Sequence, residues 1–209
     1  MSTQGSGTIF VIAAPSGGGK TSLIQALIEK MPDLVVSVSH TTRPARPQEV
    51  QGQHYHFVSE TEFKNLQSAG AFIESAQVFG HYYGTSKTTL AASLAIGHDV
   101  LLDIDWQGAQ QVRHLFPEQN SSIFILPPSR QVLHDRLCQR NQDSSDVVAQ
   151  RMSAATDEMA HCGEFDYVVV NDDFEQALAA LIGIITAERH RQKHQRQHLA
   201  PLLSELLAR

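Results

Sequence analysis

The chain has 209 residues, of which 42% are apolar, so it can bury the core of one compact α/β domain with inserted subdomains, and disorder is excluded as its default state. Its formal net charge of −6 argues against nonspecific binding to nucleic acids, because an acidic protein repels the phosphate backbone that supplies such affinity. Eleven of the sixteen basic residues are arginine, whose planar side chain matches phosphate oxygens, so the composition weakly favours phosphate recognition.

Neither a disulfide framework nor a membrane segment is predicted. The two cysteines, Cys138 and Cys162, form no CxxC pair. No apolar run approaches the roughly 20 residues of a membrane span. Residues 1–7 also lack the basic start of a signal peptide. We therefore expect a soluble, cytoplasmic protein with no membrane partner.

The first predicted element is a strand over residues 8–13, which leads into a glycine-rich turn and then a helix that begins near Lys20. Three consecutive glycines let the turn direct several backbone N–H groups toward one point, which attracts phosphate oxygens. The Lys20 side chain can reach β- and γ-phosphates, and the Thr21 hydroxyl can bind Mg²⁺. The sequence therefore predicts a nucleoside triphosphate site formed by Ala14, Pro15, Ser16, Gly17, Gly18, Gly19, Lys20 and Thr21.

This phosphate loop departs from the full pattern at one position. The complete motif has a glycine where the chain has Ala14. A plain flexible loop between a strand and a helix remains the alternative interpretation, although the apolar stripe of Leu23, Leu27 and Met31 in the helix favours the motif.

Residues 39–89 are aromatic, glycine-rich and alternating, which predicts a small, mostly antiparallel insertion. Arg43 and Arg46 lie in a proline-bordered loop and cannot satisfy each other, so they call for an anionic partner such as phosphate. Residues 82–85 offer hydroxyl groups at a predicted turn. Glu74 lies in an otherwise apolar strand, where its carboxylate can accept from the adjacent N–H groups of guanine. Solvated loop charges are the alternative interpretation.

Further strands are predicted at residues 34–38, 99–104, 122–126 and 166–170. Their continuous apolar character predicts a parallel sheet that is covered on both faces. A second insertion over residues 127–160 is predicted to be helical and carries Arg136, Arg140 and Arg151. The tail from Phe174 onward is predicted to be helical, with an interruption before Pro201.

Four segments of the chain resemble the landmarks of the guanylate kinase family. They are the signature segment 41–57 and the stretches 14–21, 102–108 and 170–173, and their order and spacing match from about residue 8 to residue 190. The match is most similar to the bacterial stand-alone enzymes. It implies an α/β fold, namely a P-loop three-layer sandwich with a central parallel sheet, a small mixed insertion that binds the nucleoside monophosphate, and a helical lid. It also implies transfer of the ATP γ-phosphoryl group to GMP or dGMP, with Mg²⁺ as cofactor.

The resemblance also implies a role for each segment and for the residues that match the family pattern. The P-loop core would comprise residues 1–38, 90–126 and 161–209, the GMP-binding insertion residues 39–89, and the lid residues 127–160. Guanine would be contacted by Ser39, Glu74 and Asp105, and the acceptor phosphate by Arg43, Arg46, Tyr55, Tyr83 and Thr85. ATP would be bound by the phosphate loop together with Arg136, Arg140 and Asn171. The catalytic residues would be Lys20, Arg43, Arg140 and Arg151.

Asp103 is the better candidate for a water-mediated contact to Mg²⁺, since it follows the apolar run 100–102. Two carboxylates spaced by one residue point to opposite faces of a strand, so separate roles for Asp103 and Asp105 require the strand to bend or end there. Which acid has which role stays open. In the lid, Asn141 stands where many members of the family have glycine.

Three other functions are less consistent with the sequence. A guanylate-kinase-like binding module without catalysis would lack parts of the phosphate loop or the arginines, which this chain has. A kinase for AMP or UMP is disfavoured by Glu74 and Asp105, because adenine and uracil lack paired donors on the corresponding edge. A GTPase would carry an Asn-Lys-x-Asp segment, which does not occur. The long C-terminal helix leaves a homo-oligomer possible, and a metal site on its shared face of His190, His194 and His198 is less favoured than a solvated basic face.

Overall fold

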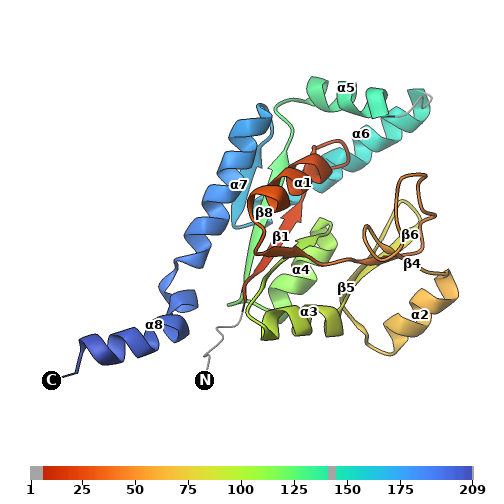
Figure 1. Cartoon of the computed structure of the whole chain (residues 1–209). Helices are drawn as coiled ribbons and strands as arrows, with labels where there is room; N and C mark the ends of the chain where they lie inside the picture. The colour runs from red at the N-terminus through yellow and green to blue at the C-terminus, as the bar shows by residue number, and fades with distance from the viewer. Residues whose placement is uncertain (1–6, 141–144, 209) are drawn as a thin grey trace.

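A sheet of five parallel strands forms the centre of the computed structural model, which describes residues 7–140 and 145–208 (Figure 1). The strand order is β2-β7-β1-β8-β9. The strands are β1 (Ile9–Ala13), β2 (Leu34–Val36), β7 (Asp99–Asp103), β8 (Asn120–Leu126) and β9 (Tyr167–Val170). All five predicted core strands are therefore confirmed, with ends that differ by one or two residues.

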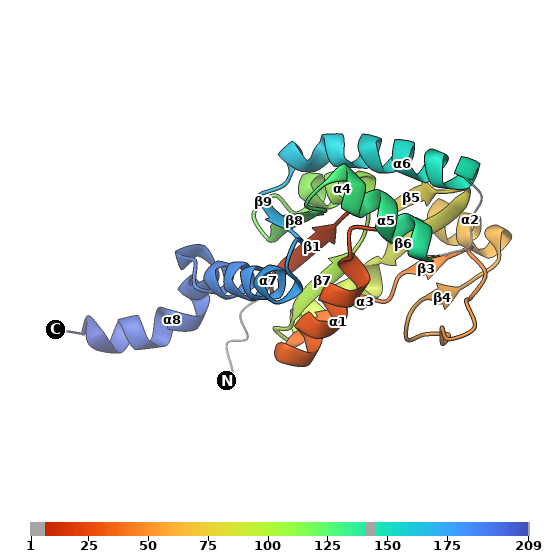
Figure 2. The ribbon, with the colours of Figure 1, turned by 90° about the horizontal axis from the view of Figure 1, so that it is seen from above.

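Side chains of β1 alternate between two apolar cores. The helices that cover the sheet are α1 (Lys20–Lys30), α3 (Lys87–Ala95), α4 (Trp106–Leu115) and α7 (Phe174–Arg189). Phe10 and Ile12 pack with α1 and α7, whereas Ile9 and Val11 pack with α3 and α4. Figure 2 shows α1 and α7 on one side of β1 and α4 on the other. Because neighbouring residues of a strand face opposite sides, β1 must be apolar throughout.

The insertion forms a second sheet of order β4-β3-β6-β5. Its elements are β3 (His40–Thr41), β4 (His56–Phe57), α2 (Glu60–Ser68), β5 (Phe72–Val78) and β6 (His81–Ser86). β6 pairs antiparallel with β3 and β5, and β3 pairs parallel with β4, so the sheet is mixed as predicted. Ile73 of β5 packs into the core beside α4, which brings the insertion next to the carboxyl end of β7.

Two helices, α5 (Arg130–Arg140) and α6 (Ser145–Ala160), connect β8 to β9. Leu133 and Leu137 of α5 pack against Ala155 of α6. α6 continues into the short helix η1 (His161–Glu164), where the His161 ring stacks on Trp106 with centroids 3.5 Å apart and planes 6° from parallel. This stack joins the base of α6 to the first residue of α4.

The C-terminal tail is interrupted at His190 and Arg191, between α7 and α8 (Gln192–Leu206), rather than beside Pro201, which lies inside α8. Arg191 is extended, with ψ 137, and its guanidinium pairs with Glu188 at 3.2 Å. Glu188 is buried and accepts from other elements of the core, so it fixes the chain at the helix end.

The break also overturns the predicted shared face of three histidines. His190 caps α7, whereas His194 belongs to α8 and lies 3.3 Å from the Thr8 hydroxyl. Burial lowers the pKa of His194, which is therefore not a residue of a fully solvated face. The side chain of His198 lies outside the described part of the chain.

α8 extends away from the core in Figures 1 and 2. Four leucines of its second half and its end are exposed, namely Leu202, Leu203, Leu206 and Leu207. Of the helices described, neither α8 nor any other has the length and apolar character to cross a bilayer.

Candidate active site

The phosphate loop runs from the carboxyl end of β1 to the N-terminus of α1. Gly17 and Gly19 have φ 88 and φ 92, a backbone region that favours glycine. A Cβ atom at Gly19 would lie 2.2 Å from Asn171 Nδ2, and a Cβ atom at Gly17 would lie 3.0 Å from the Leu133 side chain. Both positions therefore require glycine for conformation and for space.

The departure of Ala14 from the full motif has a physical explanation. Phe79 is the one non-glycine residue with positive φ among residues 7–140 and 145–208, so Ala14 has an ordinary backbone conformation. Beyond it, the Gly18 N–H donates to the Pro15 carbonyl at 2.9 Å and closes the turn. The loop thus keeps its shape without a glycine at position 14.

Lys20 and Asp103 form an ion pair below the loop. Lys20 Nζ lies 2.5 Å from Asp103 Oδ1 and donates to the Ile104 carbonyl at 3.1 Å. β1 and β7 are parallel neighbours, so their carboxyl ends place these residues together. β7 ends at Asp103, and Asp105 becomes the N-cap of α4, where its carboxylate accepts the Gly108 N–H at 2.9 Å. Because the strand ends between Asp103 and Asp105, the two carboxylates need not point to opposite faces of the sheet and can have separate roles in one site.

A cavity of about 820 Å³ joins the phosphate loop to the insertion. The predicted site residues that line it are Ser16, Lys20, Thr21, Ser39, Arg43, Arg46, Tyr55, Glu74, Tyr83, Asp103, Asp105 and Arg151. A second cavity, of about 330 Å³, is lined by the predicted residues Gly17, Gly19, Arg136 and Asn171 and also by Ser22 and Phe174. The structure thus gathers most of the predicted residues into two neighbouring groups that share the phosphate loop.

Glu74 is a buried carboxylate at the insertion side of the larger cavity. It is 3% exposed and accepts the Thr85 hydroxyl at 2.5 Å. Burial raises the pKa of Glu74 to about 7, the bond from Thr85 opposes that rise, and the charge of Asp105 reinforces it. Thr85 itself is fully buried, and its hydroxyl lies 3.4 Å from that of Ser39. Thr85 therefore supports Glu74 from behind rather than lining the cavity.

Arg43 has an anionic partner within the chain. Its guanidinium donates to both carboxylate oxygens of Glu49, at 2.7 and 2.9 Å, and these bonds lower the pKa of Glu49. The same guanidinium lies over the Tyr55 ring, 5.4 Å from its centroid, and the Tyr55 and Tyr83 rings are 6.0 Å apart. The side chain of Arg46 is exposed, while its backbone N–H donates to Glu49 at 2.7 Å.

Helices α5 and α6, which the sequence predicts to form a lid, both lie near the phosphate loop. Arg136 of α5 donates to the Asn171 carbonyl at 3.0 Å, and the Asn171 amide donates to the Gly18 carbonyl at 2.9 Å. Arg151 of α6 lines the larger cavity. Two further predicted positions, the Arg140 side chain and Asn141, lie outside the described part of the chain.

Sequence reasoning missed three contacts that shape the site. The pairing of Glu49 with Arg43 is one. At Gly108 a Cβ atom would lie 2.6 Å from Glu74 Oε2, so this glycine lets α4 approach the buried carboxylate. Glu158 of α6 accepts the Ser16 N–H at 3.0 Å. Glu158 lies seven residues, or two helical turns, after Arg151, so both share one helix face. This spacing was the one signal in the sequence that could have drawn attention to Glu158.

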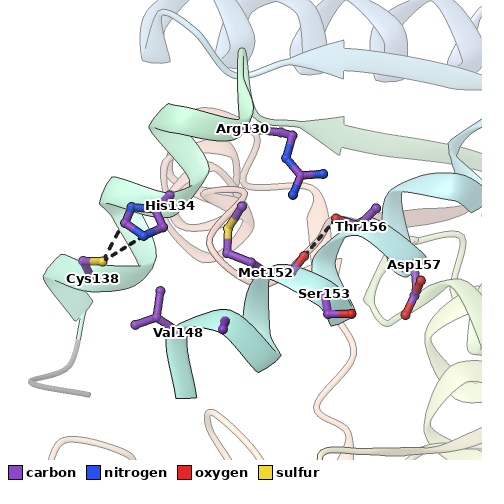
Figure 3. A pocket seen from close by; sticks show the side chains of 9 residues that line it. Arg130, His134, Cys138, Val148, Met152, Ser153, Thr156 and Asp157 are labelled. Atoms are coloured by element: carbon purple, nitrogen blue, oxygen red, sulfur yellow. Dashed lines mark hydrogen bonds between the residues drawn. The ribbon is translucent and has the colours of Figure 1, made fainter. Parts of the chain in front are cut away.

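A third cavity, of about 810 Å³, lies between α5 and α6 (Figure 3). Arg130 and His134 line it from α5, and Met152 and Asp157 line it from α6. None of the predicted site residues belongs to its lining. We therefore do not place a nucleotide there.

Comparisons with known proteins agree with one another. The family model described as Guanylate kinase matches residues 6–188. The guanylate kinase of Idiomarina loihiensis is 56% identical over 203 residues, which cover 96% of both chains. That of Escherichia coli K12 is 55% identical over 204 residues, which cover 97% of this chain and 98% of the relative. A crystal structure of guanylate kinase from Anaplasma phagocytophilum matches with a TM-score of 0.78 and 36% identity over 92% of each chain.

Proposed function

The chain belongs to the guanylate kinase family and catalyses the ATP-dependent phosphorylation of GMP to GDP, and we propose how its residues divide this work. One observation carries the proposal, because a single cavity contains both Lys20 of the phosphate loop and Glu74 of the insertion. ATP and GMP then bind with their phosphates facing each other. The γ-phosphorus bond to the ADP oxygen breaks as a bond to a GMP phosphate oxygen forms, with no phosphoenzyme.

On the donor side, we assign ATP to the phosphate loop and Lys20. Lys20 exchanges its bond to Asp103 for the β- and γ-phosphates. The Thr21 hydroxyl and the Asp103 carboxylate fit Mg²⁺, because this ion prefers oxygen ligands and both residues line the same cavity. Asp103 would act through water. When bound, Mg²⁺ supplies positive charge to the phosphate oxygens.

On the acceptor side, we assign the base to the group around Glu74. Its carboxylate accepts the paired N–H groups of guanine, with Ser39 and Asp105 beside it and Thr85 fixing its orientation. The GMP phosphate takes the place of Glu49 on Arg43 and is also held by Arg46, Tyr55 and Tyr83. None of these residues is assigned to the ribose 2′-hydroxyl, so we propose that dGMP is a substrate as well.

We propose that the arginines of the lid stabilise the negative charge of the transferring phosphoryl group. Arg151 lines the cavity from α6, and Arg136 and Arg140 belong to α5. Arginines aimed at the equatorial oxygens stabilise the transition state, and closing the cage excludes water. Asn171, in the smaller cavity, lies on the adenine side.

A substrate panel tests this division. ADP release from Mg-ATP is measured with GMP, dGMP, AMP, CMP and UMP offered separately. We expect turnover with GMP and dGMP alone. Turnover with AMP or UMP would overturn the assignment of Glu74 to guanine, and turnover with GMP but not dGMP would show that the 2′-hydroxyl is read.

We also propose that the enzyme acts in the cytoplasm, where its nucleotide substrates are found, and that it forms a homo-oligomer through α8. The exposed leucines near the end of α8 support this proposal, because a two-fold symmetric contact places the same surface of two copies together.

A further inference from the structure

Glu158 links the lid to the phosphate loop directly. Its carboxylate Oε2 accepts the backbone N–H of Ser16 at 3.0 Å, across a separation of 142 residues. Glu158 belongs to the last turns of α6, and Ser16 lies just before the glycines of the loop. A backbone N–H is an obligatory hydrogen-bond donor, so an acceptor oxygen at this position attaches α6 to the loop.

The surroundings of Glu158 suit a hydrogen-bond acceptor more than a solvated surface acid. Burial raises its pKa, while the Ser16 N–H and the charge of Lys20 oppose that rise. Asp105 and the neighbouring Asp157 are the other charges that act on it. Glu158 therefore contacts the loop through Ser16 and lies within the electrostatic influence of Lys20 and Asp105.

Arg151 lies on the same face of α6 as Glu158. Seven residues separate them, which corresponds to two helical turns and roughly 10 Å along the axis. Arg151 lines the cavity that also contains Ser16 and Lys20. Ala155 of α6 packs on Leu133 and Leu137 of α5. α6 is therefore attached both to α5 through this packing and to the phosphate loop through Glu158.

We propose that Glu158 is a positioning residue for phosphoryl transfer, which fixes α6 on the phosphate loop through Ser16 and thereby sets the place of Arg151 above the transferring group. This inference rests on the proposed role of Arg151. Glu158 touches neither nucleotide in this scheme and acts through the helix that it anchors.

Three substitutions separate a hydrogen-bond role from a role of charge. Glu158→Gln keeps an acceptor oxygen without the charge, and Glu158→Ala removes the acceptor. Asp157→Asn removes a charge from the adjacent residue, which is exposed, lines the cavity of Figure 3 and accepts no bond from the loop. We expect kcat to fall about tenfold to a hundredfold in Glu158→Ala, with KM for GMP within about twofold, and to stay within about threefold in Glu158→Gln and Asp157→Asn.

A double-mutant cycle with Arg151→Ala tests the path of the effect. If Glu158 acts through Arg151, Glu158→Ala lowers kcat strongly in the wild-type chain and less than about twofold further in the Arg151→Ala chain. Full additivity would overturn the inference, as would a Glu158→Gln variant that is as slow as Glu158→Ala.

Thermal unfolding of each variant distinguishes positioning from general destabilisation. If Glu158 positions α6, kcat of Glu158→Ala is low even at temperatures where the variant remains fully folded. Warming within that range should not restore kcat. A loss of kcat that only follows loss of folded protein would overturn the inference. Wild-type kcat in Arg151→Ala would overturn the proposed role of Arg151 itself, whereas a slow Arg151→Ala with a normal Glu158→Ala would overturn the inference about Glu158 alone.

Discussion

At the scale of single residues, the site is a set of charged groups that already have partners in the chain. Lys20 is paired with Asp103, and Arg43 with Glu49. In the division of roles that we propose, nucleotide phosphates therefore replace carboxylates as partners of the cations. Glu74 differs from these acids, because the groups that donate to it are the neutral hydroxyl and backbone N–H of Thr85 rather than a cation.

The first prediction concerns the pH dependence of GMP binding. The pKa of Glu74 is raised to about 7, mainly by burial, and only its deprotonated form accepts both N–H groups of guanine. We expect KM for GMP to rise as the pH falls through about 7, measured between about pH 5.5 and pH 8.5. Thr85→Val removes a bond that lowers this pKa, so it should move the rise to higher pH. A KM for GMP that is flat over this range would contradict the assignment.

The stability of the protein without GMP should show the opposite trend. The folded-state pKa of Glu74, about 7, lies above its ordinary value of 4.5, so the folded state binds the proton more tightly than the unfolded state. The contribution of Glu74 to the free energy of unfolding is therefore fully present below about 4.5 and is lost as the pH rises through about 7. Urea unfolding of wild type and Glu74→Gln at several pH values isolates this contribution.

A third prediction concerns Lys20. Lys20→Ala removes the cation that we assign to the transferring phosphates, and kcat should fall by about a hundredfold or more. The fold should survive, because the Asp103 side chain left behind is 27% exposed and can be solvated. Lys30→Ala, at the exposed end of the same helix, is the matched control and should leave kcat unchanged. A Lys20→Ala variant that retains a tenth of the wild-type rate would contradict the role.

At the scale of elements, glycines decide how closely the helices approach the site. Gly108→Ala would place a Cβ atom 2.6 Å from Glu74 Oε2 and displace that carboxylate. We expect KM for GMP to rise about tenfold or more, equivalent to ~1.4 kcal/mol, with KM for ATP unchanged. Gly183→Ala in α7 is the matched control, since its Cβ atom would meet nothing within 4 Å. Equal KM values for GMP in the two variants would refute this explanation of Gly108.

The turn between β5 and β6 gives a prediction about stability. Phe79 and Gly80 form a two-residue hairpin loop with φ 48 and φ 80, as a type I′ turn requires. Phe79 is 59% exposed, so little burial is lost when it is replaced. Phe79→Asn should raise the free energy of unfolding by about 1 kcal/mol, because asparagine tolerates positive φ. Phe79→Ala removes the same ring without that tolerance and should show no such gain in a urea titration.

The elements that the sequence predicted well are those encoded by local patterns. The phosphate loop and the five core strands follow from glycine spacing and continuous apolar runs. The resemblance to the family identified most of the residues that line the two cavities. The break at His190 depends instead on contacts of Glu188 with Ser121 and Tyr167. The contacts of Glu158 with Ser16 and of Gly108 with Glu74 likewise join distant segments, so no local pattern identifies the partner of either residue.

At the scale of the whole molecule, α8 stands apart from the compact body in Figures 1 and 2. Leu206 and Leu207 at its end are 68% and 74% exposed. We expect light scattering to give a mass above that of one 23.0 kDa chain. Leu206→Glu with Leu207→Glu should return the mass to that of a monomer, while Glu205→Gln, on the same helix, should not. A wild-type monomer at the concentrations of the assay would refute the proposed contact.

The stack of Trp106 on His161 gives the chain its own optical probe. Trp106 is the only tryptophan of the sequence, so all intrinsic emission at long wavelength comes from this one indole. His161 directly follows the helix that carries Arg151 and Glu158, and its ring covers the indole face, with the ring centroids 3.5 Å apart. Any movement of α6 relative to α4 changes the exposure and quenching of that indole. Stopped-flow fluorescence of the unlabelled enzyme can therefore detect such a movement and time it against product formation.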